Sequence, residues 1–131
     1  MIRTPITLLL LLALVSPATA QDAELGSLDF PNSGAPEAQE PFIRGVLALH
    51  SFWYDEAVKQ FRLARELDPA FALAYWGEAT AHDHPLWGQH DEAAGSAVLA
   101  ALERLTPADR SRWTAREQRY LAAARTLYGP G

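Results

Sequence analysis

Residues 54–69, YDEAVKQFRLARELDP, are the stretch that decides the fold of this chain. Its small and apolar side chains recur every three or four positions, which places them on one face of a helix with about 3.6 residues per turn. The opposite face is charged or polar, and the final Asp-Pro pair predicts a helix end. We expect a neighbouring helix to pack closely against the apolar face, which comprises Ala57, Phe61, Ala64 and Leu67.

The N-terminus has the features of a secretory signal peptide. Arg3 precedes the apolar run at 6–15, and the small residues Ala18 and Ala20 follow it, so residues 1–20 are predicted to be removed. The run is too short to cross a bilayer, which takes about 20 apolar residues. We therefore expect a periplasmic or secreted protein with no membrane span after cleavage.

Composition excludes one class of partner. The 131-residue chain has a formal net charge of −5 and no cysteine. Because binding to phosphates depends on clustered Lys and Arg, the acidic balance argues against nucleic acid as a ligand. Without cysteine, helix packing alone must stabilise the fold.

The remaining segments predict an all-α fold with about five helices. Residues 21–40 are rich in Gly, Pro, Ser and Asn, which predicts a flexible leader. No later segment alternates with a period of two, as a half-buried strand would. Besides the opening stretch, helices are expected at 41–53, 69–84, 91–105 and 115–128, with a short turn at 107–112 and a loop at 85–90 anchored by Trp87.

Helices of this length with short connections are typical of stacked helical hairpins. In a frame of about 34 residues, the segment 38–71 resembles the tetratricopeptide repeat, because its signature positions hold Gly45, Tyr54, Ala57, Phe61, Ala64 and Pro69. The resemblance implies an α-solenoid with a degenerate second repeat at 72–105 and part of a third at 106–131. AYWGEA followed by HPLW also resembles a group of secreted bacterial repeat proteins without assigned chemistry. Since a stable solenoid takes at least about three repeats, we expect the chain to be part of a longer array.

The resemblance also implies a binding site, because the first helix of each repeat lines a concave groove in this family. An exposed apolar groove normally marks a binding surface, and the alternative is that the leader or further repeats cover it. We expect a scaffold or adaptor that binds a protein or peptide, without cofactor or catalytic residue. The implied groove residues are Phe42, Val46, Leu49, His50, Trp76, Thr80, Asp83 and His84.

A second hypothesis is metal binding, or an accessory role in an enzyme, through the segment 82–90. Imidazole and carboxylate ligands suit zinc or another transition ion, and the candidates are His82, His84 and His90. On the expected helix, however, His82 and His84 would point in nearly opposite directions, so they could bind one ion only if the helix end unwound. No nucleophile or phosphate-binding loop accompanies them, so we favour a binding protein over an enzyme.

Overall fold

Six α-helices form most of residues 25–129, which are the part of the chain that the computed structural model describes. The signal peptide predicted at 1–20 and residues 21–24 of the predicted leader lie outside it. The prediction of an all-α class is confirmed at this level. The helices are α1 (Pro36–His50), α2 (Tyr54–Leu67), α3 (Ala72–Thr80), α4 (Glu92–Ala101), α5 (Pro107–Arg110) and α6 (Ala115–Tyr128).

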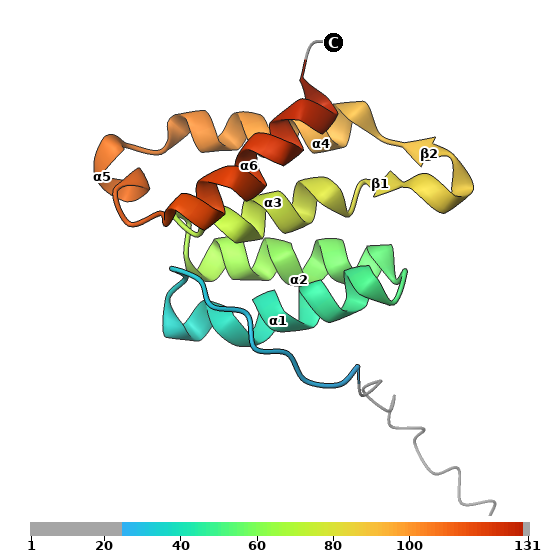
Figure 1. The fold of residues 1–131 in the computed structure, drawn as a ribbon, viewed down its shortest axis with the longest axis horizontal. Helices are drawn as coiled ribbons and strands as arrows, with labels where there is room; N and C mark the ends of the chain where they lie inside the picture. The colour runs from blue at the N-terminus through green and yellow to red at the C-terminus, as the bar shows by residue number, and fades with distance from the viewer. Residues whose placement is uncertain (1–24, 130–131) are drawn as a thin grey trace, which may run out of the picture.

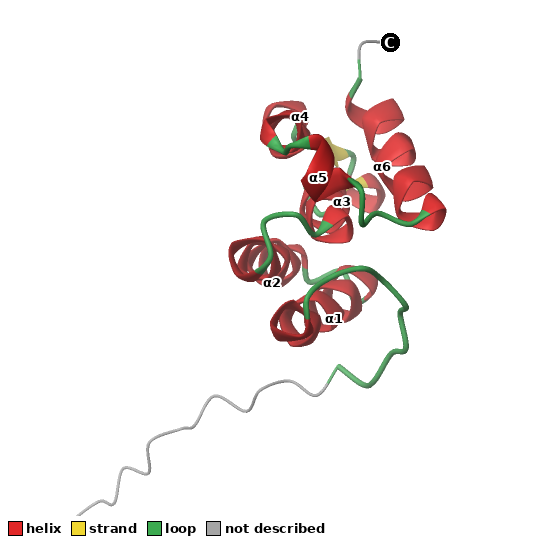
Figure 2. Cartoon of the chain, turned by 90° about the vertical axis from the view of Figure 1, so that its left-hand side faces the viewer, coloured by secondary structure: helices red, strands yellow, loops and turns green. Residues whose placement is uncertain are grey.

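The helices stack in chain order, each against the one before it, from α1 to α4 (Figure 1). A view along the helices shows α2 and α4 on one side and α1 and α6 on the other, with α3 between them (Figure 2). The segment before α1 runs along the side of α1 and α6. None of the described helices combines the length and apolar character needed to cross a bilayer.

The first helix begins earlier than predicted, at Pro36 rather than at residue 41. A proline is well suited to the first turn of a helix, where its missing N–H would have no partner. Pro36 takes this place, and Pro41 lies inside the helix, at a cost of one backbone hydrogen bond. The part of the predicted leader at 36–40 is therefore helical.

The third helix is shorter than predicted at both ends, since it begins at Ala72 rather than at residue 69 and ends at Thr80 rather than near residue 84. The expectation that no strand occurs was also wrong. Asp83 pairs with His90 and His84 with Gln89, which joins β1 (Asp83–His84) to β2 (Gln89–His90) in a small antiparallel hairpin. The tip consists of a 3₁₀ turn, η1 (Pro85–Trp87), followed by Gly88 at φ 61°, a conformation that glycine adopts without strain.

Close packing around Phe61 explains two glycines inside helices. A Cβ atom added to Gly45 of α1 would lie 2.9 Å from the Phe61 ring, and one added to Gly77 of α3 would lie 2.3 Å from it. The ring of α2 therefore fills a space that exists only because both neighbouring helices lack a side chain there. The close approach predicted from the opening stretch is confirmed for Ala57, Phe61 and Ala64, which are fully buried, but not for Leu67, which is 42% exposed at the end of α2.

The C-terminal helices match their predicted starts. Thr106 and Asp109 form a capping box at α5, within the predicted turn, and Thr114 and Glu117 form a second one at α6, which spans the predicted 115–128. Before α5, the helix α4 ends at Ala101 and the chain continues as the 3₁₀ turn η2 (Leu102–Arg104), so the predicted helix at 91–105 is interrupted near its end.

Candidate functional site

Residues 25–35, here called the docked segment, lie against the helices on the side of α1 and α6 (Figure 2). Its Phe30 contacts the ring of Phe42 edge-on at 5.4 Å between centroids and the ring of Tyr120 at 5.9 Å. The guanidinium of Arg116 lies 4.7 Å from the centre of the Phe30 ring, within the range of a cation–π contact. Phe30 thus bridges α1 and α6.

Polar contacts fix the segment after Phe30. The backbone N–H and the hydroxyl of Ser33 both donate to the Glu117 carboxylate, each at 2.8 Å, and Glu117 is only 1% exposed. The guanidinium of Arg112 donates to the carbonyl of Ser33 at 2.6 Å and to the Asp68 carboxylate at 2.6 Å. Asp68 also accepts the backbone N–H of Ala35 at 2.8 Å. Because the groups involved are charged, these hydrogen bonds are of the stronger kind.

The docked segment also carries its own turn. The side-chain amides of Asn32 and Gln39 exchange two hydrogen bonds, at 2.8 and 2.9 Å, and the Asn32 oxygen accepts the N–H of Gly34 at 2.9 Å. The amide of Gln39 donates further to the carbonyl of Gly34. The turn that leads into α1 is therefore satisfied by side chains, and it directs residues 25–33 back along that helix.

The predicted groove residues fall into two groups. Phe42 and Val46 are fully buried in the core, where Phe30 and neighbouring helices cover them. The remaining six stay at least partly accessible. The partly accessible residues are Leu49, His50, Trp76, Thr80, Asp83 and His84.

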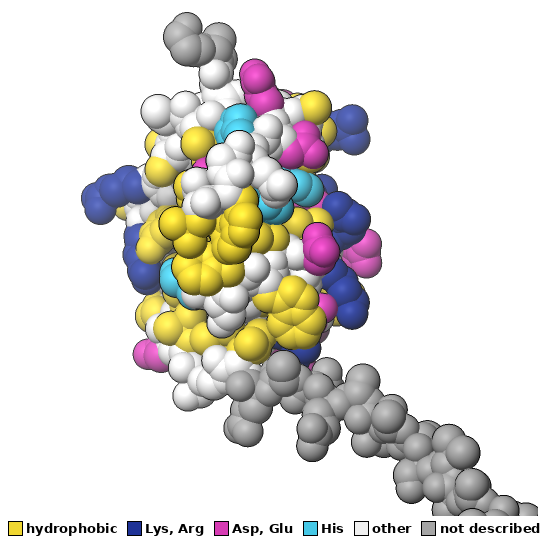
Figure 3. All heavy atoms as spheres, turned by 90° about the vertical axis from the view of Figure 1, so that its right-hand side faces the viewer, with side chains coloured by type: hydrophobic (Ala, Val, Ile, Leu, Met, Phe, Trp, Pro, Cys, Tyr) yellow, Lys and Arg dark blue, Asp and Glu magenta, His cyan; other side chains and the backbone are white. Residues whose placement is uncertain are grey.

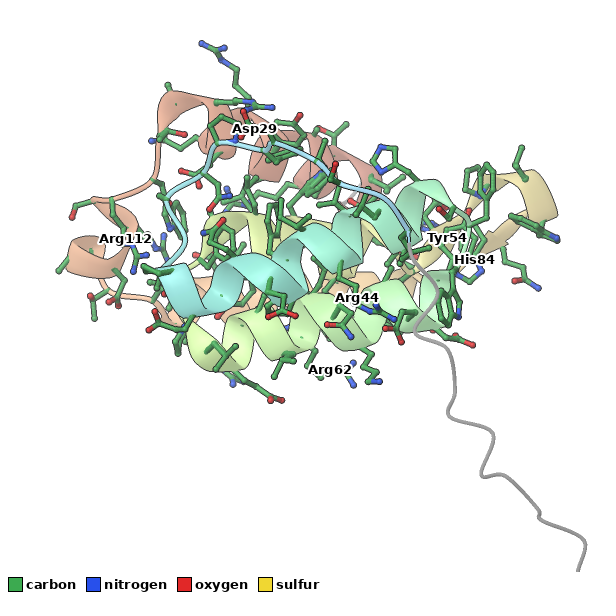
Figure 4. The ribbon with its side chains drawn as sticks, turned by 90° about the horizontal axis from the view of Figure 1, so that it is seen from below. Asp29, Arg44, Tyr54, Arg62, His84 and Arg112 are labelled. Carbon is green, nitrogen blue, oxygen red and sulfur yellow. The ribbon has the colours of Figure 1, made fainter. Side chains whose placement is uncertain are left out.

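A second cluster of rings lies where the hairpin meets the α1–α2 loop, and we call Phe52, Tyr54, His84 and Trp87 the aromatic end. The imidazole of His84 stacks on Tyr54 at 3.8 Å, and Figure 4 shows these two side chains together. Trp87 contacts the rings of Phe52 and Tyr54 edge-on, both at 5.8 Å. The prediction that Trp87 anchors its loop holds only in part, because the indole is 57% exposed.

The backbone of Phe52 is unusual, since its φ of 60° is the one positive value at a non-glycine residue within 25–129. The N–H of Trp53 donates to the carbonyl of Ala48, and that of Phe52 to the carbonyl of Leu49. This is the helix-ending motif that normally takes glycine at the position of Phe52. A residue with a side chain costs about 1–2 kcal/mol in the left-handed region. At this position the residue is an aromatic one, and it is 54% exposed.

The histidines of the hairpin do not converge on a common centre. The ring nitrogens of His84 lie 3.0 Å from the carbonyl of Ala81 and 3.1 Å from the Gln89 side chain. His90 stacks on Tyr128 at 4.9 Å and bonds Asp83 at 3.0 Å. An open hollow of about 500 Å³ lies beside them, yet within the described residues no group of three or more His, Cys, Asp or Glu side chains is arranged to hold a metal ion.

Burial changes the proton affinity of two groups around this hollow. Burial raises the pKa of the Tyr128 hydroxyl to about 12, with a further contribution from the negative charges of Asp83 and Asp91. That hydroxyl stays protonated and donates to the carbonyl of Ala79 at 2.7 Å. Burial lowers the pKa of His82 and outweighs the opposite effect of Glu78 and Asp91.

Around α2, the charged groups pair with one another. Glu78 of α3 is buried and accepts from Arg62 at 3.0 Å and from Arg65. Burial raises the pKa of Glu56, but hydrogen bonds from Arg44 and Gln60 outweigh it, so that the pKa lies below its ordinary value. Figure 4 shows Arg44 between α1 and α2. These pairs stabilise the contacts of α2 with α1 and α3. The candidate binding region is therefore the part of the surface that carries the ring contacts of Phe30 and of the aromatic end.

Sequence reasoning missed the anchoring role of Glu117 and Arg112. Nothing in the periodicity of α6 indicates that the Glu117 carboxylate, which caps its own helix, also accepts from Ser33. For Phe30, an aromatic side chain in the polar segment 21–40 is the one available signal. Comparison with known proteins adds no assignment, because no family model, no curated protein and no solved structure matches this chain.

Proposed function

We propose that the protein is a scaffold module that binds an extended segment of a partner polypeptide on the side formed by α1, α3 and α6. The observation that carries this proposal is the docked segment itself. It occupies this side as an extended chain and inserts Phe30 between Phe42 and Tyr120. Its backbone donates a hydrogen bond to Glu117 and accepts one from Arg112. A partner segment with a similar pattern can use the same contacts.

The arrangement of the helices supports this proposal further. In a tetratricopeptide-type array, the first helices of successive repeats share the concave side, and α1, α3 and α6 are the helices in those places of the predicted repeats. Side chains of these helices are also in contact, since Trp76 of α3 meets Tyr120 of α6 at 4.8 Å between ring centroids, and Phe30 of the docked segment touches both Tyr120 and Phe42 of α1. Aromatic contacts along an extended segment are typical of peptide recognition.

The docked segment and a partner would compete for the same contacts. Competition of this kind weakens the apparent affinity for the partner, because only the fraction of molecules with a released docked segment can bind it. A variant that weakens the resident segment should therefore bind an external peptide more tightly than the natural sequence does. We propose the secreted or periplasmic compartment as the place of binding, in line with the N-terminal sequence.

Isothermal titration with a synthetic peptide of residues 25–35 tests this function. The full chain carrying Phe30→Ala should bind the peptide about tenfold more tightly than the unmodified chain, equivalent to about 1.4 kcal/mol. A peptide with alanine in place of the phenylalanine is the matched control and should not bind. Equal affinity of the two chains, or equal binding of the two peptides by a chain with an intact circular dichroism spectrum, would refute the proposal.

A further inference from the structure

The aromatic end lies beyond the docked segment and has no role in the function proposed above. Phe52 and Trp87 are 54% and 57% exposed, and Leu86, next to Trp87, is 69% exposed. Single exposed apolar side chains are normal. Here, however, Phe52 and Trp87 belong to two different loops, and their ring centroids lie 5.8 Å apart. Figure 3 views this end of the molecule and shows apolar side chains gathered on its surface.

The rings of the aromatic end are held in place before any ligand arrives. Tyr54 starts α2, and its ring stacks on His84, whose own nitrogens are held by the Ala81 carbonyl and by Gln89. Phe52 is fixed by a helix-ending motif in a backbone conformation that glycine normally supplies. A rigid aromatic surface loses little conformational entropy on binding, which is a property of protein-recognition sites.

The charges around the aromatic end indicate the kind of partner. The two segments that build it, 45–58 and 81–93, contain no Lys or Arg, although Arg44 and Lys59 border the first of them. Asp55 is exposed at the start of α2, and the exposed Asp91 and Glu92 line the hollow beside His84. In Figure 3 the Lys and Arg side chains lie towards the margins of this face. The open faces of Trp and Phe rings attract cations, and the acidic surroundings disfavour an anionic lipid surface.

We propose that the aromatic end docks a segment of a partner polypeptide in which an apolar side chain stands next to Lys or Arg. The apolar side chain covers Leu86 and the exposed edge of Trp87. The cation lies over the ring faces, with Asp55 and the carboxylates at the start of α4 near it. This surface is separate from the groove beneath the docked segment, so one molecule can hold two segments of a partner at the same time.

Titration with three short peptides tests the proposal, and the NMR signals of the backbone amide and indole N–H groups are the readout. One peptide alternates lysine with leucine, the second replaces lysine by glutamate, and the third replaces leucine by serine. The lysine–leucine peptide should shift the Trp87 indole signal and bind about tenfold more tightly than either of the others. Trp87→Ala should weaken its binding about tenfold, whereas Leu67→Ala, which removes a 42% exposed side chain at the far end of α2, should not.

Several outcomes would overturn the proposal. Equal binding of the lysine and glutamate peptides would exclude a role for charge, and equal loss in Trp87→Ala and Leu67→Ala would exclude this location. Sedimentation that shows self-association lost in Trp87→Ala, without any peptide binding, would assign the surface to a second copy of the chain. Binding to phosphatidylcholine vesicles without peptide binding would assign it to a membrane.

Discussion

The Glu117 carboxylate accepts two hydrogen bonds from Ser33, a residue 84 positions earlier in the chain. The same carboxylate also accepts the backbone N–H of Thr114, at 2.7 Å, and so caps its own helix. One buried side chain therefore starts α6 and anchors the docked segment. The N-terminal part of the described chain is coupled to the last helix through this residue.

Ser33→Ala removes the hydroxyl bond to Glu117 and leaves the backbone bond in place. A hydrogen bond to a charged group contributes about 1.5–3 kcal/mol, and we expect a loss near the lower end of this range because one contact remains. Urea unfolding gives the value. The control is Ser111→Ala, which removes an exposed bond to the Ala108 carbonyl and should change stability by less than about 0.5 kcal/mol. Equal effects of the two variants would show that Ser33 does not anchor the segment.

Gly77→Ala should destabilise the protein by about 1–3 kcal/mol, the usual cost of overpacking a core. The reason is the 2.3 Å approach that a new Cβ atom would make to the Phe61 ring. Adding Phe61→Leu should recover part of this loss, because the smaller side chain frees the space. Thermal unfolding of both single variants and the double variant measures the coupling. Strictly additive effects would mean that the two residues do not share this contact.

Phe52→Gly should be more stable than Phe52→Ala by about 1 kcal/mol, although glycine is normally the less stable choice. Both variants lose the ring contacts with Tyr54 and Trp87, but only glycine relieves the left-handed backbone at φ 60°. Chemical denaturation of the pair isolates the backbone contribution. If the alanine variant were equally stable, the conformation of Phe52 would carry no strain.

Stability should rise with pH through the range just below 6.5 because of His82. Its folded-state pKa lies below the ordinary value of 6.5 through burial, so the unfolded chain binds the proton more readily in that window. The free energy of unfolding therefore falls as the pH drops through 6.5 and continues to fall until the folded-state pKa is reached. His82→Gln should reduce this dependence, measured by urea unfolding at several pH values. An unchanged slope would contradict the role of His82.

The sequence predicted the helices best where periodicity and end signals agree. The opening stretch became α2, and the helix predicted at 115–128 became α6, which begins with a capping box at Thr114. The end of α3 was missed, because two-residue strands are too short to show alternation and because the hairpin depends on stacking of His84 on Tyr54. Such contacts between distant residues leave no periodic signal.

The candidate site was predictable only in part, for a related reason. Repeat positions indicate which side of a helix faces the groove, but they do not indicate what covers that side. Phe42 satisfies the pattern of a groove residue, yet the structure buries it beneath Phe30. The contacts of Glu117 and Arg112 with Ser33 depend on the path of a segment without regular secondary structure, and that path is not encoded in periodicity.

The most direct test of the central claim, that a partner segment replaces the docked segment, uses one fluorescent label. The sequence contains no cysteine, so Asp29→Cys, at an exposed position of the docked segment, can be labelled alone. Fluorescence anisotropy is then followed while the peptide of residues 25–35 is added. The account predicts a saturable fall in anisotropy as the resident segment is released, and no fall with the peptide that lacks the phenylalanine. Unchanged anisotropy at peptide concentrations that saturate the Phe30→Ala chain would contradict it.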